Sequence, residues 1–148
     1  GLMNKIFLNN VKVLIFCILF SFVYGSGAIF ILTWNASVIG AAVGNFVRTH
    51  IASVADATGF AKAGAYFHGS ALSVLRYATH GVPEIAAYFI AGLAGGILSV
   101  AIIRHDFGTA NFEKILLDAS DLILISIFVL FVAALLEVFV TPLFFSTF

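Results

Sequence analysis

Charged side chains are scarce in this sequence. Asp, Glu, Lys and Arg make up 9% of the 148 residues, whereas hydrophobic residues make up 62%. A soluble domain carries about 25% charged residues, so this chain has too few to cover a surface that faces water. Its net charge is zero and its basic residues are sparse, which argues against a nucleic-acid-binding protein. The sequence therefore predicts an integral membrane protein, with the lipid bilayer as its first partner.

Cysteine and the familiar catalytic motifs are missing as well. Cys17 is the one cysteine, so the chain can form no internal disulfide. There is no HExxH or CxxC motif, no nucleophile elbow and no Walker A loop, because the glycines lie within apolar runs. These absences argue against an enzyme and imply no cofactor. The length allows one membrane domain, residues 1–148.

Long apolar runs are what the chain has instead. No Asp, Glu, Lys or Arg interrupts residues 13–47 or 85–103, and residues 122–148 contain only Glu137. The hydrocarbon core of a bilayer is about 30 Å thick and takes about 20 apolar residues of helix to cross. The pattern predicts an all-α, polytopic transmembrane helical bundle with about five membrane helices. Three spans are clear, at 11–33, 83–103 and 121–143, and two short or re-entrant segments are expected within 35–82.

Polar residues and proline suggest where these helices end. Asn10 is a candidate N-cap for the first helix, and the polar break at 33–35 predicts its end and the start of a second helix over 35–49. Residues 50–62 are expected to form a connection or an interfacial helix, and 63–79 a weaker apolar segment. Pro83 suits the first turn of a helix, where its missing N–H costs nothing.

The stretch 104–120 is the most polar part of the chain and is expected to be a loop, with Asp118 or Ser120 capping the last helix. Basic residues then suggest the orientation. Five crossings with a cytoplasmic N-terminus leave only Arg76 against the positive-inside tendency. We therefore expect a multi-pass protein of the cell membrane, with its N-terminus in the cytoplasm and its C-terminus outside.

Glu84 and Glu137 stand out because they lie beside or within apolar runs. A charged group at bilayer depth costs at least roughly 2.5–3.5 kcal/mol, so it usually has a partner or a task. Glu84 has a structural interpretation as a first-turn residue favoured by the helix dipole, with His80 in the loop before it. Glu137 has one as a buried carboxyl group paired with Arg76 or a histidine. The functional interpretation is an ion or proton site at a shared depth.

His80, Glu84 and Glu137 are also weak candidates for metal ligands, with His50 or His68 nearby, because imidazole and carboxylate suit zinc, iron or manganese. Two helices carry small residues at GxxxG spacing, which lets helix backbones approach closely. These residues are Gly40, Gly44, Gly92 and Gly96. They indicate either packing within one protomer or an interface between copies.

Several motifs together resemble the stage II sporulation protein M family of integral membrane proteins. The two distinctive ones are a His-Gly-x-x-Glu block at 80–84 and a terminal Glu followed by Thr-Pro at 137–142. The others are Asn10, the Gly25–Gly27 stretch, the 32–36 segment containing Asn35, Gly40, and the pair Gly92 and Gly95. Ala36 departs from the glycine that the family commonly has.

The resemblance implies a multi-span helical membrane scaffold, which in spore-forming bacteria acts with peptidoglycan-degrading partners and has no established chemistry of its own. We therefore favour a non-enzymatic membrane scaffold or assembly partner, in a homo-oligomer or with another membrane protein. One alternative is a transporter or channel with an ion or proton site at Glu84 and Glu137. Another is a metal-dependent membrane enzyme. The candidate functional residues are Glu84, Glu137, His80, Asn35, Asn10 and Thr141.

Overall fold

The computed structural model describes residues 1–25, 28–53, 58–105 and 107–145, and this part of the chain consists of helices and their connections, with no strand. The predicted all-α class is therefore confirmed. In chain order the helices are α1 (Leu2–Tyr24), α2 (Ala28–Ser53), α3 (Gly59–Ile103), α4 (Ala110–Leu135), the π-helix η1 (Leu136–Val140) and α5 (Thr141–Phe145).

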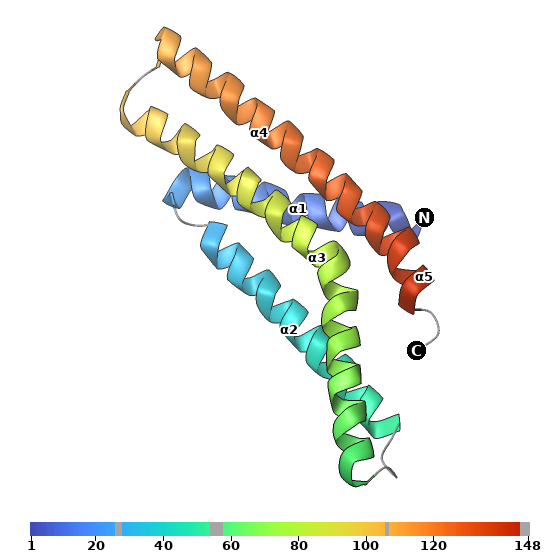
Figure 1. The fold of residues 1–148 in the computed structure, drawn as a ribbon. Coiled ribbons are helices and arrows are strands. Elements are labelled where there is room, and N and C mark those ends of the chain that lie inside the picture. The colour runs from blue at the N-terminus through green and yellow to red at the C-terminus, as the bar shows by residue number, and fades with distance from the viewer. Residues whose placement is uncertain (26–27, 54–57, 106, 146–148) are drawn as a thin grey trace.

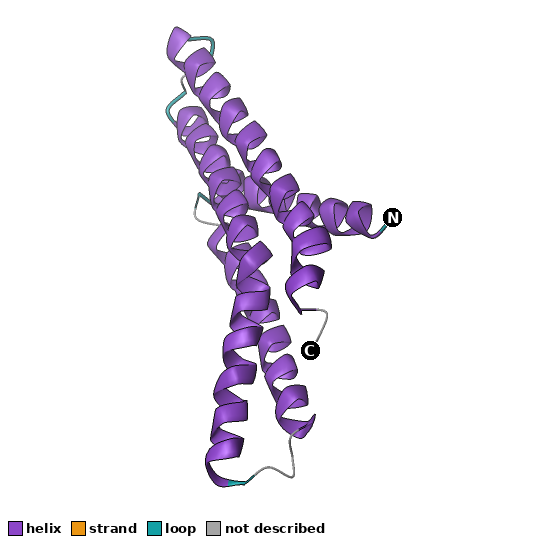
Figure 2. Cartoon of the chain, turned by 45° about the vertical axis from the view of Figure 1, so that its right-hand side comes forward, coloured by secondary structure: helices purple, strands orange, loops and turns teal. Residues whose placement is uncertain are grey.

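The helices pack around α3, which is the longest (Figure 1). Its second half lies antiparallel to α4 and is crossed by α1, while its first half pairs with α2. Figure 2 shows that α2 and the first half of α3 form a hairpin that extends away from the other helices. The molecule thus has a bundle part and a hairpin part, joined through α3.

Three helices among the described residues are long and apolar enough to cross a membrane: Leu2–Tyr24, Gly59–Ile103 and Ala110–Leu143. The prediction of three clear spans is confirmed in number. The expected total of about five is not confirmed.

The first helix ends earlier than predicted. It stops at Tyr24 and is followed by Gly25 with a φ of +66°, a backbone conformation that glycine adopts without strain. The polar break predicted at 33–35 is wrong, because these residues lie inside α2. The Thr33 hydroxyl donates to the Ile29 carbonyl at 2.8 Å, and the Asn35 amide donates to the Ile31 carbonyl at 3.0 Å. Polar side chains that bond back to their own helix do not interrupt it.

The expected boundary at Pro83 is also wrong. Pro83 lies inside α3, and His80 and Glu84 share that continuous helix. Proline removes one backbone donor and presses on the carbonyl four residues earlier, which bends a helix that neighbours hold in place. Figure 1 shows the bend where α3 turns from green to yellow. The separate elements predicted at 63–79 and 83–103 are therefore parts of one continuous helix. Within the stretch predicted at 50–62, α2 ends at Ser53 and α3 begins at Gly59, and residues 54–57 lie outside the described part of the chain.

The polar stretch 104–120 is mostly helical rather than a loop. Thr109 caps α4, and its hydroxyl oxygen accepts from the Phe112 N–H at 3.1 Å. The predicted caps Asp118 and Ser120 lie inside α4, where the Ser120 hydroxyl donates to the Leu116 carbonyl at 2.8 Å. A helix is capped where its first turn forms. In α4 that turn follows Thr109, three turns before the apolar run begins.

The core is built on small residues of α3. Leu14 and Cys17 of α1 and Leu130 of α4 are buried against it. Small side chains let helix backbones approach closely. In lipid this close packing stabilises the bundle, because the hydrophobic effect that stabilises a soluble core does not act between membrane helices. The buried small residues in the bundle half of α3 are Ala87, Ala91, Gly92, Ala94, Gly95, Ser99 and Ala101.

Gly95 marks the closest approach of α1 to α3. A Cβ atom at this position would overlap the Ile18 carbonyl oxygen and lie 3.1 Å from the Ser21 Cβ. Of the four predicted packing glycines, Gly92 is buried in the bundle. A Cβ atom at Gly40, Gly44 or Gly96 would meet nothing within 4 Å. The structure thus uses Gly92 for internal packing and leaves the other three open.

Gly95→Ala should destabilise the protein because the added methyl group forces α1 away from α3. We expect a loss of about 1–3 kcal/mol in the free energy of unfolding, the usual cost of overpacking. Gly96→Ala is the matched control and should be neutral or gain up to about 1 kcal/mol, since alanine favours a helix more than glycine does. Unfolding by SDS, followed by far-UV circular dichroism, measures both. Equal effects of the two substitutions would contradict the close contact at Gly95.

Candidate functional site

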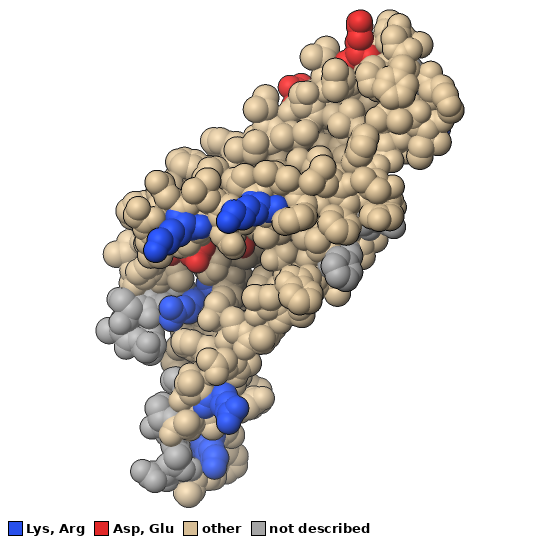
Figure 3. Space-filling model, turned by 180° about the vertical axis from the view of Figure 1, so that it is seen from behind, with Lys and Arg blue, Asp and Glu red and all other residues tan. Residues whose placement is uncertain are grey.

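Polar side chains from three helices converge on one pocket of about 450 Å³, here called the polar hollow. Figure 3 shows acidic side chains set into this face of the molecule, between basic side chains that project further outward. Glu84 and Glu137, for which the sequence suggested a shared depth, both line this pocket. The hollow is lined by Lys5, Ile6, Asn9, Asn10, His80, Glu84 and Glu137.

Asn10 joins α1 to the hollow. It lies in the third turn of α1, is only 8% exposed, and its side-chain amide donates a hydrogen bond to Glu84 Oε1. The prediction that Asn10 caps a helix is wrong, because α1 begins eight residues earlier, at Leu2. A buried carboxylate needs donors to replace water, and the Asn10 amide supplies one.

Glu137 lies on the π-helix η1, where the turn holds one more residue than an α-helical turn. The cause is local. Pro142 has no N–H for the Val138 carbonyl, and its ring pushes that carbonyl away. Thr141 stabilises the widened turn, because both its N–H and its hydroxyl donate to the Leu136 carbonyl, the hydroxyl at 3.1 Å.

His80 lies next to Thr141, beside the hollow. Its Nδ1 lies 3.4 Å from the Thr141 hydroxyl oxygen, and both residues line a second pocket of about 440 Å³ together with Glu137 and Arg76. The charges of Glu137 and Arg76 both act on the His80 ring. Arg76 also lies over the Phe46 ring of α2, with 5.6 Å between the guanidinium carbon and the ring centroid. Arg76 and His80, which the sequence offered as alternative partners of Glu137, thus line one pocket with it.

Asn35 is not part of the hollow. Its amide bonds within α2, and it lines an apolar groove that adjoins the hollow at Asn9. Among the described residues, no group of three or more His, Cys, Asp or Glu side chains is placed to hold a metal ion. His68 lies three turns before His80 on α3, and the side chain of His50 is outside the described part.

Lys5 and Asn9 line the hollow but were not predicted to be functional residues. They follow one face of α1, and the signal in the sequence is their spacing of four residues, continued by Val13 and Phe16. That pattern has meaning only once α1 is known to begin at Leu2 and to cross α3.

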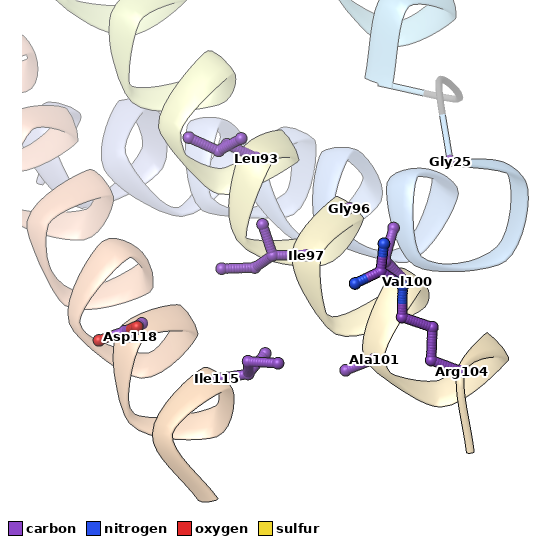
Figure 4. Close-up of a pocket in the computed structure, with 9 residues that line it drawn as sticks. All are labelled: Gly25, Leu93, Gly96, Ile97, Val100, Ala101, Arg104, Ile115 and Asp118. Carbon is purple, nitrogen blue, oxygen red and sulfur yellow. The ribbon is translucent and has the colours of Figure 1, made fainter. Parts of the chain in front are cut away.

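The hollow lies at one end of an apolar layer. From Glu84 to Arg104, α3 carries no other charged residue and rises about 30 Å, close to the hydrocarbon thickness of a bilayer. At the opposite end Arg104 and Asp118 border an apolar pocket of about 560 Å³ between α3 and α4. Figure 4 shows Ile97 of α3 and Ile115 of α4 on either side of this gap. Charged groups therefore mark both ends of the layer, as the cost of burying them in hydrocarbon demands.

The profile of the family described as stage II sporulation protein M matches residues 1–142. The chain belongs to this family. The resemblance carried by the 80–84 and 137–142 motifs is therefore confirmed, and with its three membrane-crossing helices this family member is a membrane protein. No curated protein and no solved structure matches the chain. The matched range includes every residue of the polar hollow.

The hydrogen bond between Asn10 and Glu84 should stabilise this family member measurably. Asn10→Ala should lower the free energy of unfolding by about 1–3 kcal/mol, because it leaves a half-buried carboxylate without its donor. Asn9→Ala, at the exposed neighbouring position, is the control and should change it by less than about 0.5 kcal/mol.

A double-mutant cycle of Asn10→Ala with Glu84→Ala isolates this pair. We expect a coupling energy of at least about 1 kcal/mol in unfolding by SDS. A coupling within about 0.3 kcal/mol of zero would show that the two side chains do not interact.

Proposed function

We propose that this member of the stage II sporulation protein M family is a non-enzymatic membrane scaffold that assembles with copies of itself or with another membrane protein. The observation that carries the proposal is an apolar side of the hairpin that no part of the described chain covers. The transporter and the metal-dependent enzyme are favoured neither by the described residues nor by the family match.

The hairpin is a long, well-defined arm. From Gly59 to His80, α3 rises about 32 Å beyond the level of the polar hollow. One side of this arm is covered by α2, where the Ser73 hydroxyl donates to the Val43 carbonyl at 3.3 Å and Arg76 lies over Phe46. These contacts hold the arm as a helical pair.

Beside the face that α2 covers, α3 carries exposed large apolar residues at seven-residue spacing. Phe60 is 96% exposed, Phe67 74% and Val74 57%. Seven residues are close to two helical turns, so these side chains form one row along the helix. Apolar rows at this spacing are typical of helices that pack lengthwise against another helix. A continuous apolar row of this kind is a better binding surface for a partner helix than apolar residues scattered singly over a surface.

Gly40 and Gly44 supply a second open face on the same arm. Both lie on α2 one turn apart, and there is open space around the position that a Cβ atom would take. Glycines at this spacing let a neighbouring helix approach closely. Gly44 and Val74 line one pocket of the arm, so the open glycines and the apolar row border each other and together support the packing of a partner helix there.

Replacing both open glycines should weaken assembly. We expect single-molecule photobleaching of the labelled protein in native-membrane nanodiscs to show two or more copies per particle, or one copy with a partner at fixed stoichiometry. The double variant Gly40→Leu with Gly44→Leu should reduce the assembled fraction about fivefold or more, which corresponds to about 1 kcal/mol. Its leucines would hold a neighbouring helix at a distance.

Gly96→Leu is the control, because Gly96 is equally open but lies on the bundle half of α3. It should leave the assembled fraction unchanged. Phe67→Ser tests the apolar row separately and should reduce assembly as well. Wild-type protein that is strictly monomeric and brings no partner with it would overturn the scaffold proposal.

A further inference from the structure

An apolar groove adjoins the polar hollow between α1 and α2. The groove has a volume of about 530 Å³ and shares Asn9 with the hollow. Its other lining residues are Val13, Phe16, Ile31, Trp34, Asn35 and Val38. A polar compartment that leads into an apolar one matches an amphiphile, which has a head group at one end and a hydrocarbon chain at the other.

The face of α1 gives this pair of compartments a direction. Lys5, Asn9, Val13 and Phe16 succeed one another at intervals of four, four and three residues, so they follow one side of the helix. Their polarity falls from a cation to an amide to two hydrocarbon side chains. The fall runs from the polar hollow into the apolar layer, which is the direction in which a lipid chain enters a bilayer.

The charges of the hollow select the head group. Glu84 and Glu137 line the same hollow, so a cation between them would relieve their repulsion. Asn10 donates to one oxygen of Glu84, and a carboxylate can accept further hydrogen bonds. Lys5 lines the hollow and Arg76 lines the adjoining pocket, and either can meet a phosphate.

We propose that the polar hollow and the adjoining apolar groove form one binding site for a phospholipid whose head group carries a primary ammonium. The ammonium donates to Glu84 and Glu137, the phosphate lies against Lys5, and one acyl chain follows Val13 and Phe16 towards Trp34. A phospholipid with an anionic head group would place its charge beside the two carboxylates. A trimethylated ammonium has no N–H to donate.

Trp34 makes the proposal directly measurable. It is the one tryptophan of the chain, lines the groove and is 65% exposed. Acyl chains that carry bromine quench tryptophan fluorescence on contact. The wild-type protein is placed in nanodiscs of unlabelled phosphatidylcholine, and a small mole fraction of brominated lipid is added with an ethanolamine, a glycerol or a choline head group.

The brominated ethanolamine lipid should reach half of its maximal quenching at about a tenfold lower mole fraction than the other two lipids. That factor corresponds to about 1.4 kcal/mol, in the range of a charge-assisted hydrogen bond. Equal quenching by the three lipids in wild-type protein would overturn the proposal, because Trp34 would then report only bulk lipid. Stronger quenching by the glycerol lipid would overturn it too, in favour of an anionic head group.

Variants test which residues cause the preference for the ethanolamine lipid. Glu84→Gln and Glu137→Gln should each remove most of it, and glutamine at 84 keeps an oxygen that can accept from Asn10. Glu113→Gln is the matched control, because Glu113 is an exposed carboxylate in the first turn of α4. A preference that survives both glutamine variants would place the site elsewhere. This result is independent of assembly, so the lipid site and the scaffold can fail separately.

Discussion

The contact of α1 with α3 at Gly95 is the constraint on which the rest of the structure depends. The Ile18 carbonyl and Ser21 lie directly against this glycine, so α1 crosses α3 at a fixed place. In the adjoining part of the same contact, Cys17 is buried in one cluster with Ala87 and Ala91. Continued towards the N-terminus, this packing delivers Asn10 to Glu84. In a membrane, helix contacts of this kind depend on close fit rather than on exclusion of water.

A second local constraint brings Glu137 to the same place from α4. Pro142 cannot complete an α-helical turn, and Thr141 holds the resulting π-turn through the Leu136 carbonyl. The turn adds a residue, which places Thr141 in the buried face beside His80 while Glu137 remains at the hollow. The terminal Glu and Thr-Pro motif therefore has a structural meaning, in which the Thr-Pro pair shapes the backbone that presents the carboxylate.

Composition and apolar runs were enough to predict the helical class, the membrane setting and three spans, because a bilayer leaves few other ways to pair backbone groups. Glu84, Glu137 and His80 could be singled out because polar groups beside hydrocarbon are costly. The ends of the helices were harder to predict. Thr33 and Asn35 are satisfied within α2, and Pro83 only bends α3, so neither acts as the breaker that its residue type suggests. The roles of Lys5 and Asn9 depend on the crossing of α1 and α3, which no local pattern contains.

The most direct test of this account asks whether α1, through Asn10, meets α3 at Glu84 in the membrane. In a Cys17→Ser background, the pair Asn10→Cys with Glu84→Cys is treated with a short bifunctional thiol reagent in native membranes, and the product is identified by mass spectrometry after proteolysis. The structure predicts efficient linkage within one chain, and little for Asn35→Cys with Glu84→Cys, since Asn35 lies outside the hollow. Absence of the first product, or equal yields from both pairs, would contradict the assembly of the polar hollow.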